Sequence, residues 1–141
     1  MDQMRVFQPF FAMMLLTLAV WVLMYARRLP FLVRSGMIRQ REITPLQLAQ
    51  QSPAAVAAAS DNLKNLFELP TLFYGVVLYL YFTQQVDAAY LAACWIFFAG
   101  RVLHSTVHCT FNYIPLRFVL YVISAAALWS MILRAAWRVF S

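Results

Sequence analysis

Long apolar runs alternate with short polar segments along the whole chain. The first run, residues 7–25, carries no charged residue and is close to the roughly 20 residues that a membrane-spanning helix needs. Further runs with helical character occupy residues 53–82, 88–110 and 116–140. The pattern therefore predicts an all-α membrane protein, a bundle of four transmembrane helices with bounds close to these ranges.

The second of these helices is too long to lie wholly within a bilayer. Residues 53–82 would make about 45 Å of helix, whereas the hydrocarbon core is about 30 Å thick. We therefore expect its first turns to project from the membrane and Pro70 to kink it near the point of entry. Upstream, Thr44 and Pro45 resemble an N-cap and a first helical residue, which predicts a short helix over "TPLQLAQQ".

Composition supports the membrane assignment. Hydrophobic residues make up 64% of the chain and charged residues only 11%, against about 25% charged residues in a soluble domain. A length of 141 residues fits a single integral membrane domain, residues 1–141. The net charge of +6 comes from basic residues that lie between apolar runs rather than in a soluble basic patch, so we expect no nucleic acid partner.

The distribution of arginine predicts how the chain is oriented. The connection at residues 27–52 holds five arginines and one acidic residue, which is typical of a cytoplasmic loop. We therefore expect this loop and the turn at residues 111–116 to be cytoplasmic, and both termini to be non-cytoplasmic. Arg134 and Arg138 run against this rule but are outweighed by the five-arginine loop.

The third helix contains polar residues within an apolar sequence. Arg101, His104 and His108 are spaced at i, i+3 and i+7, so they share one face of a helix. Polar residues at bilayer depth usually face the bundle interior and are paired. In the second helix, one side collects four further polar residues: Asp61, Lys64, Asn65 and Glu68. From this arrangement we predict a salt bridge between Arg101 and Glu68, and we expect Lys64 to be solvated where the helix projects.

Several of these residues have more than one reading. Asn65 and Glu68 are as well explained by hydrogen bonding between helices as by ligand contact. His104 and His108 are four residues apart, the spacing of helical metal pairs, but no third ligand cluster is evident, so we predict no metal site. Cys94 and Cys109 lie about 22 Å apart on one helix, too far for a disulfide, and are expected to be packing residues.

Two motifs carry a resemblance to a known family. One is "NLFELP", in which Asn65 and Glu68 match an N-x-x-E motif, and the other is "GRVLHSTVHCTFNYIPLRFVLYV" at residues 100–122. The second is similar to an A-R-x-x-H-T-x-x-Y segment followed by a P-x-R that opens a fourth helix. From about Pro53 to its end, the chain resembles the membrane-associated proteins in eicosanoid and glutathione metabolism (MAPEG), which include the microsomal glutathione transferases.

The resemblance implies a homotrimer that binds glutathione between subunits near the cytoplasmic face. Arg117 would hold the thiolate of glutathione. This chain departs from the family's motifs at two positions. Asp61 stands where the family has an arginine, and His108 stands where it has a tyrosine. The residues that the resemblance makes candidates for binding glutathione are Asn65, Glu68, Arg101, His104, His108 and Tyr113.

The leading functional hypothesis is thus a glutathione-dependent transferase or peroxidase that acts on lipophilic electrophiles dissolved in the bilayer. Because a thiolate is a far better nucleophile than a thiol, its main task would be to lower the pKa of the bound thiol. The alternative is a non-catalytic helical bundle of the same fold in which the polar cluster is structural. A proton or ion pathway along the Arg101 and His104 face ranks last.

Overall fold

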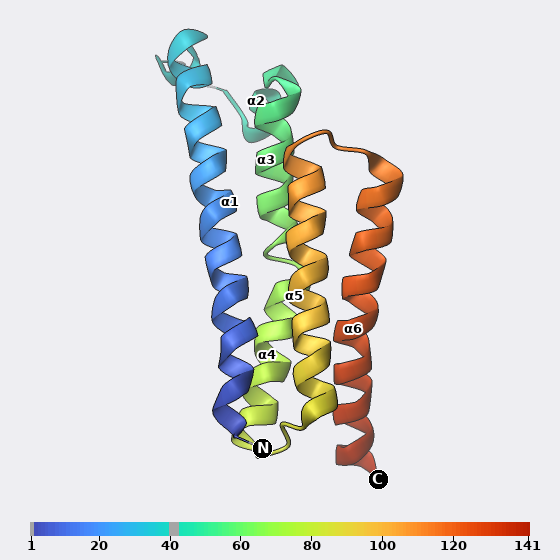
Figure 1. Ribbon diagram of the computed structural model, residues 1–141. Coiled ribbons are helices and arrows are strands. Elements are labelled where there is room, and N and C mark those ends of the chain that lie inside the picture. Colours follow the sequence, from blue (N-terminus) through green and yellow to red (C-terminus); the bar gives the residue numbers. More distant parts are fainter. Residues whose placement is uncertain (1, 40–42) are drawn as a thin grey trace.

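The computed structural model describes residues 2–39 and 43–141, which form an up-and-down bundle of long helices (Figure 1). No strand occurs in this described part of the chain, and four stretches of it are long and apolar enough to cross a membrane, as predicted: Gln3–Arg34, Ala54–Phe82, Ala88–Cys109 and Ile114–Phe140. The elements in order are η1 (Gln3–Val6), α1 (Phe7–Arg34), η2 (Met37–Arg39), α2 (Pro45–Gln51), α3 (Ala54–Asn65), α4 (Leu69–Phe82), α5 (Ala88–Cys109) and α6 (Ile114–Phe140).

The first helix is longer than predicted. The sequence pattern ends it at residue 25, but α1 continues to Arg34 with Pro30 inside it. Arginine is a good helix former, so the charges mark the end of the apolar stretch and not the end of the helix. α1 stops where Gly36 adopts a φ of +71°, the left-handed conformation that commonly follows a helix C-terminus. Arg41 and Glu42 of the predicted loop lie outside the described residues.

The second span is broken rather than merely kinked. Instead of one helix over residues 53–82, α3 ends at Asn65 and α4 begins at Leu69. Pro70 lies within the first two positions of α4. It has no N–H to donate, and in a continuous helix its ring would clash with the carbonyl of Leu66, four residues earlier. The break at residues 66–68 is therefore a consequence of Pro70, and it turns out to position the candidate site.

The short helix α2 forms as predicted. The Thr44 hydroxyl accepts a hydrogen bond from the Gln47 N–H at 3.3 Å, and the Gln47 side chain accepts one from the Thr44 N–H at 2.9 Å. This reciprocal arrangement is a capping box. α2 lies over the start of α3 (Figure 1).

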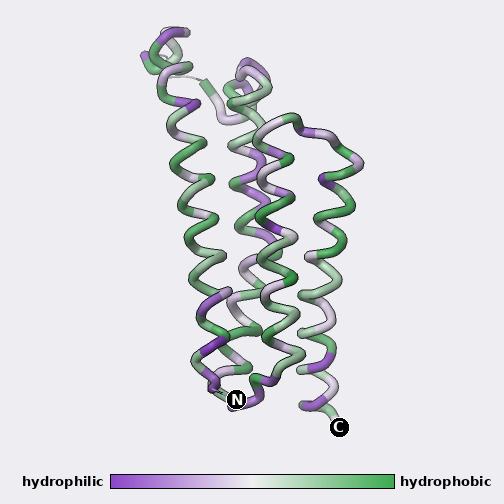
Figure 2. Tube along the Cα trace, in the orientation of Figure 1, coloured by the Kyte–Doolittle hydropathy of each residue, from purple (hydrophilic) through white to green (hydrophobic). Residues whose placement is uncertain are grey.

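The bundle has two different ends. One, here called the terminal end, holds both chain termini and the connection at residues 83–87; the other, here called the arginine-rich end, holds the α1–α2 connection and the turn between α5 and α6 (Figure 1). Hydrophilic positions gather at both ends and along α3 and the neighbouring half of α5 (Figure 2). The apolar core fills the terminal half, where Phe73 stacks on Phe97 with ring centroids 4.6 Å apart. The polar interior thus belongs to the arginine-rich half.

Candidate functional site

Arg101 is the centre of the polar interior and is fully buried. It lies on α5 directly after Gly100, where α5 and α6 approach closely. A Cβ built on Gly100 would lie only 2.9 Å from the Cβ of Ser124, so no larger residue fits there without a shift. Small residues at this crossing let α6 close over the side chain of Arg101.

The guanidinium of Arg101 is anchored by the break in the second span. Its Nη2 donates a hydrogen bond of 2.9 Å to the carbonyl oxygen of Asn65, the last residue of α3. Carbonyls at a helix C-terminus have no partner within the helix, and the dipole there favours a cation. The guanidinium carbon also lies 5.7 Å from the ring centroid of Tyr121. Arg101 therefore joins α3, α5 and α6.

Two nitrogens of the same guanidinium are left unused. Nε and Nη1 of Arg101 are buried and have no hydrogen-bond partner among the described residues. A buried charge without partners is costly, and buried polar groups in proteins are almost always hydrogen-bonded. These two donors are therefore suited to an anionic group such as a carboxylate or a thiolate.

The predicted salt bridge between Arg101 and Glu68 does not form. Within the described residues, the ion pairs closer than 4.0 Å are Lys64–Asp61, Arg134–Asp87 and Arg138–Asp87. Glu68 lies inside the break, with φ −90° and ψ −99°, and its side chain is exposed. The prediction assumed a continuous helix, which would have kept Glu68 on the same face as Asn65. Because the helix breaks, the backbone carbonyl of Asn65 takes the place of the Glu68 carboxylate.

The two histidines line the interior above Arg101. His104 and His108 are both buried, with ring centroids 5.6 Å apart and planes at 84°. His104 also lies 6.0 Å from the ring of Tyr121. The Nδ1 atom of each histidine is buried without a hydrogen-bond partner in the described chain. The prediction that this face of α5 points into the bundle is confirmed, and it leaves four unpartnered nitrogens in one region.

The turn between α5 and α6 places Arg117 at the arginine-rich end. α5 ends at Cys109, and Asn112 lies in the turn that follows, with a φ of +47°. The Nη1 of Arg117 donates a 2.8 Å hydrogen bond to the side-chain oxygen of Asn112. The side chain of Tyr113 is exposed, so within one chain it does not join this cluster.

A second polar network in the interior was missed by sequence reasoning. The fully buried Asn62 accepts a hydrogen bond from the Ser105 hydroxyl at 3.3 Å and donates one to the Cys109 sulfur at 3.4 Å. Nearby, Nη1 of Arg27 donates to the carbonyls of Ala55 and Cys109 at 3.1 and 3.0 Å. These bonds tie α1, α3 and α5 together. A usable signal was present, since Asn62 shares the apolar face of α3 with Ala59 and Leu66.

Lys64 and the two cysteines lie as the sequence predicts. Lys64 pairs with Asp61 at 2.9 Å, with both side chains more than half exposed, so the predicted solvation of Lys64 is confirmed. Cys94 and Cys109 are free and buried. Among the described residues, no three His, Cys, Asp or Glu side chains come together as a possible metal site.

Comparison with known proteins identifies the family. The model of the MAPEG family matches residues 6–137, nearly the whole chain. Searches of the curated proteins and of the solved structures find no match. The members of this family are helical membrane proteins that use glutathione. On the strength of the family match and the four apolar spans, the chain belongs to the MAPEG family.

Proposed function

We propose that this protein is a membrane-embedded, glutathione-dependent transferase or peroxidase that acts on lipophilic electrophiles. The observation that carries the proposal is the pair of unpartnered donors on Arg101, in the interior of a MAPEG family chain. Glutathione is an anionic thiol, so it offers the carboxylate or thiolate that these donors lack. As a co-substrate it requires no bound metal.

In this proposal the buried cluster and the exposed polar residues bind glutathione together. Arg101 supplies charged donors, and a hydrogen bond to a charged group contributes about 1.5–3 kcal/mol. His104 and His108 supply one unpartnered nitrogen each. The residues assigned to binding are Asn65, Glu68, Arg101, His104, His108 and Tyr113.

Arg117 is proposed as the residue that stabilises the thiolate. It lies in the first turn of α6, two residues after Pro115, where unpaired backbone N–H groups and the helix dipole favour an anion. Its guanidinium stays charged at physiological pH, and Asn112 holds it in place. These features can lower a thiol pKa from its usual 8.5 towards neutrality, by roughly one unit or more.

The proposed reaction is a nucleophilic attack within the bilayer. The thiol loses its proton to water at the arginine-rich end, and the resulting thiolate forms a carbon–sulfur bond with the electrophile as the leaving group departs. For a hydroperoxide, one glutathione thiolate attacks the distal oxygen, the O–O bond breaks, and the alkoxide leaves and takes up a proton to become an alcohol. A second glutathione thiol then attacks the resulting sulfenic acid, which gives glutathione disulfide and water. Both versions need the thiolate to persist in an apolar setting, which is the role given to Arg117.

We further propose that the protein is a homotrimer. Glu68 is exposed two residues before Pro70, near the point where we expect the second candidate span to enter the bilayer, and an acidic residue that faces lipid there is costly. A neighbouring subunit that covers Glu68, Asn65 and Tyr113 would complete the binding site. The orientation is also part of the proposal, with loop 27–52 and turn 111–116 cytoplasmic and both termini non-cytoplasmic.

Ligand binding tests the function directly. Glutathione at 100 times its Kd should stabilise the detergent-solubilised protein by about 2.7 kcal/mol, seen as a rise in Tm. The bound thiol should show thiolate absorbance in the ultraviolet at neutral pH, and Arg117→Ala should raise its apparent pKa while leaving the fold and the trimer intact. Arg28→Ala, at a half-buried arginine of α1 outside the cluster, is the matched control.

The competing reading is a non-catalytic bundle whose polar cluster is structural. It is supported if saturating glutathione changes neither Tm nor the ultraviolet spectrum. Binding without thiolate absorbance at neutral pH, or an Arg117→Ala variant that titrates like the wild type, would remove the catalytic role of Arg117.

The orientation has its own test. An introduced Cys at Ser35, which is exposed after α1, should not react with a membrane-impermeant thiol reagent in intact cells. The native Cys94 and Cys109 are buried and give little background. Ready labelling from outside would reverse the proposed orientation.

A further inference from the structure

The two histidines of the chain lie at different levels on α5. Each is buried, with an Nδ1 atom that has no hydrogen-bond partner among the described residues. A neutral imidazole accepts a proton through one ring nitrogen and exchanges it readily near neutral pH. His108 is one residue before the end of α5 at Cys109, and His104 is four residues further back. His104 therefore lies about 6 Å deeper in the bundle than His108.

His108 is level with Arg117, the residue proposed to hold the thiolate. α5 and α6 run antiparallel and are joined by the turn at residues 110–113, so the distance from this turn measures the depth in the bundle (Figure 1). Arg117 comes three residues after α6 begins at Ile114, and its depth differs from that of His108 by about 3 Å. The charge of Arg117 also acts on the ring of His108. A thiolate held by Arg117 would thus lie in the same layer as His108.

The two helix ends at this turn favour opposite charges. His108 is in the last turn of α5, where the helix dipole favours a cation. Arg117 is in the first turn of α6, where the dipole favours an anion. Transfer of a proton from a thiol to the imidazole creates this pair of charges, an imidazolium on α5 and a thiolate on α6.

The charges around His108 make it a proton acceptor before the ligand binds. On α1, Arg27 is bonded to the carbonyl of the neighbouring Cys109. A cation disfavours a second positive charge beside it, so a ring surrounded mainly by guanidinium groups stays neutral until an anion arrives. Three charged residues act on the ring from α5, α6 and α3: Arg101, Arg117 and Asp61.

The acidic residues nearest the site are less well placed to take the proton. Asp61 is paired with Lys64 at 2.9 Å in a bridge whose two side chains are more than half exposed. The charge of Glu68 acts on Arg101, which lies about 10 Å deeper than His108. Neither carboxylate is therefore both free and level with the proposed thiolate.

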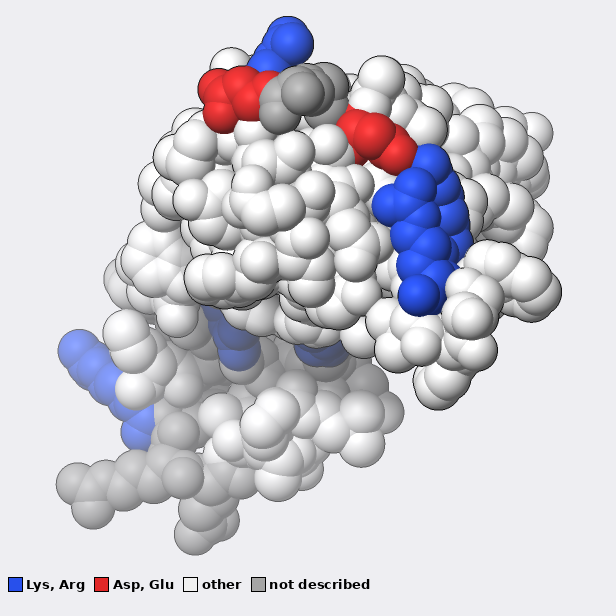
Figure 3. All heavy atoms as spheres, turned by 90° about the horizontal axis from the view of Figure 1, so that it is seen from below, with Lys and Arg blue, Asp and Glu red and all other residues white. Residues whose placement is uncertain are grey.

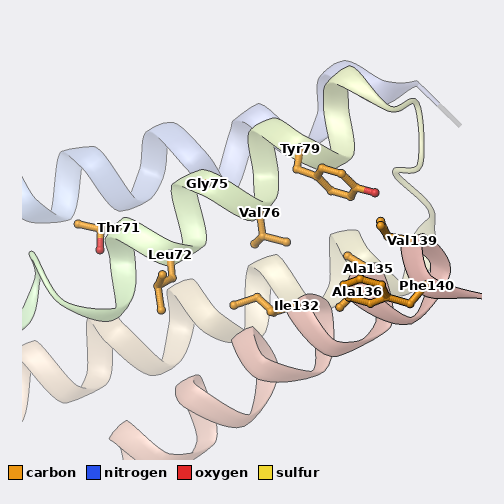
Figure 4. Close-up of a pocket in the computed structure, with 10 residues that line it drawn as sticks. All are labelled: Thr71, Leu72, Gly75, Val76, Tyr79, Ile132, Ala135, Ala136, Val139 and Phe140. Atoms are coloured by element: carbon orange, nitrogen blue, oxygen red, sulfur yellow. The ribbon is translucent and has the colours of Figure 1, made fainter.

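The other half of the bundle offers no better acceptor among the described residues. Seen from below, the terminal end shows a mostly uncharged face on which acidic side chains lie beside basic ones (Figure 3), and Asp87 is held there by Arg134. The groove between α4 and α6 is lined mainly by apolar side chains (Figure 4). Its two hydroxyl groups, those of Thr71 and Tyr79, are already hydrogen-bonded.

We propose that His108, instead of water, accepts the proton of the bound thiol and returns it to the oxygen that leaves a hydroperoxide. This inference rests on the proposed function. The S–H bond breaks, the proton goes to a ring nitrogen of His108, and the thiolate stays at Arg117. When the thiolate attacks the distal oxygen and the O–O bond breaks, the alkoxide takes the proton from the imidazolium. The products of this step are the sulfenic acid, an alcohol and a neutral His108.

Proton release during thiolate formation tests the proposal. Full-length protein in detergent and weak buffer is mixed with glutathione, while a pH indicator follows released protons and ultraviolet absorbance follows the thiolate. The wild type should form the thiolate without releasing a proton. His108→Gln can still form hydrogen bonds but cannot bind the proton, so at a pH where it shows thiolate it should release about one proton for each thiolate. S-methylglutathione, which has no thiol proton, gives the release caused by binding alone, and this is subtracted.

The second histidine provides the matched control. His104→Gln should bind glutathione more weakly, but at saturation it should form the thiolate without releasing a proton, as the wild type does. Equal unfolding temperatures of His108→Gln and wild type without glutathione show that the variant is folded. The wild-type measurement decides between His108 and water as a site of the proton even if the variant does not fold, because water does not retain it.

Return of the proton is tested with two electrophiles. The alkoxide that leaves cumene hydroperoxide needs a proton, whereas the chloride that leaves 1-chloro-2,4-dinitrobenzene does not. His108→Gln should therefore lower kcat for the hydroperoxide by about 100-fold, the usual loss for a general acid, and should lower kcat for the aryl chloride much less. Equal losses would show that His108 does not return the proton to the leaving oxygen.

The remaining outcomes separate this inference from the proposed function. One proton released by the wild type for each thiolate would make water the acceptor and overturn the role of His108, while glutathione would still be activated. Retention of the proton by His108→Gln, or its release by His104→Gln, would also overturn that role. Absence of thiolate from the wild type at neutral pH would contradict the proposed function itself, and the inference with it.

Discussion

Arg101 and Arg134 are both arginines on membrane-spanning helices, but their surroundings differ. Arg134 makes two hydrogen bonds to Asp87, at 3.0 and 2.6 Å, and lies 4.4 Å from the ring centroid of Tyr90. Arg101 is more deeply buried and makes one hydrogen bond, to a backbone carbonyl, while two of its nitrogens have no partner in the described chain. The more deeply buried arginine, Arg101, therefore makes fewer hydrogen bonds than Arg134.

The difference separates a structural arginine from one available to a ligand. Arg134 serves the terminal end, where Asp87 joins the start of α5 to α6 and where Gln3 exchanges two hydrogen bonds with Val86. Arg101 serves the arginine-rich half, where its one bond holds the break in the second span. Four predictions test whether the two arginines differ in this way.

Loss of Arg101 should act mainly on ligand binding. Arg101→Met should weaken glutathione binding by about 10- to 100-fold, because it removes at least one hydrogen bond from a charged donor, which contributes about 1.5–3 kcal/mol. Its effect on the unliganded protein should be smaller, since the variant also removes a buried charge. Isothermal titration calorimetry measures the first effect and unfolding in mixed micelles the second. Arg134→Met is the matched control, and equal loss of glutathione binding in both variants would erase the proposed distinction.

The close crossing beside Arg101 should be sensitive to one added methyl group. Gly100→Ala should lower the free energy of unfolding by about 1–2 kcal/mol, because its Cβ would lie 2.9 Å from that of Ser124 and overpacking outweighs the gain in helix propensity. The double variant Gly100→Ala, Ser124→Gly should recover most of the loss. A neutral Gly100→Ala would mean that α6 can move away freely, and the burial of Arg101 would then not depend on this contact.

Sequence patterns predicted the membrane spans and the inward face of α5. They did not predict the hydrogen-bond partners of the polar side chains on that face. Periodicity is a local property, so Arg101 and His104 could be assigned to the interior from spacing alone. The partner of Arg101 depends on the break at residues 66–68, a non-local outcome in which Pro70 opens the helix and α5 supplies the donor. The length of α1 was missed for a different reason, because arginines end a membrane span without ending a helix.

Replacing Arg134 should lower the stability of the protein without weakening glutathione binding. Arg134→Met should lower the free energy of unfolding by about 1 kcal/mol, at the upper end for a partly exposed ion pair, since both side chains are more than one-third exposed. Unfolding in mixed micelles, with and without glutathione, should show the same loss. A double-mutant cycle with Asp87→Asn should give a coupling energy, whereas additive effects would show that the pair contributes nothing.

The smallest effect concerns pH. The hydrogen bond from Arg134, together with that from the Tyr90 N–H and the charges of Arg134 and Arg138, lowers the pKa of Asp87 despite its partial burial. A carboxyl group whose pKa is lower in the folded state stabilises the protein above its unfolded pKa, about 3.9 for Asp, and this stabilisation is lost as pH falls through the folded pKa.

The wild type should therefore lose its stability advantage over Asp87→Asn progressively below about pH 4. Asn keeps the N-cap of α5 but can accept only one of the two hydrogen bonds from Arg134, so it is the pH-dependent part of the difference between the two unfolding curves that reports the charge. Solvent screening at this partly exposed pair keeps the effect small. If the two curves stay parallel down to the lowest pH at which both proteins fold, the Asp87 carboxylate adds no charge-dependent stability, and the terminal end is held by packing instead.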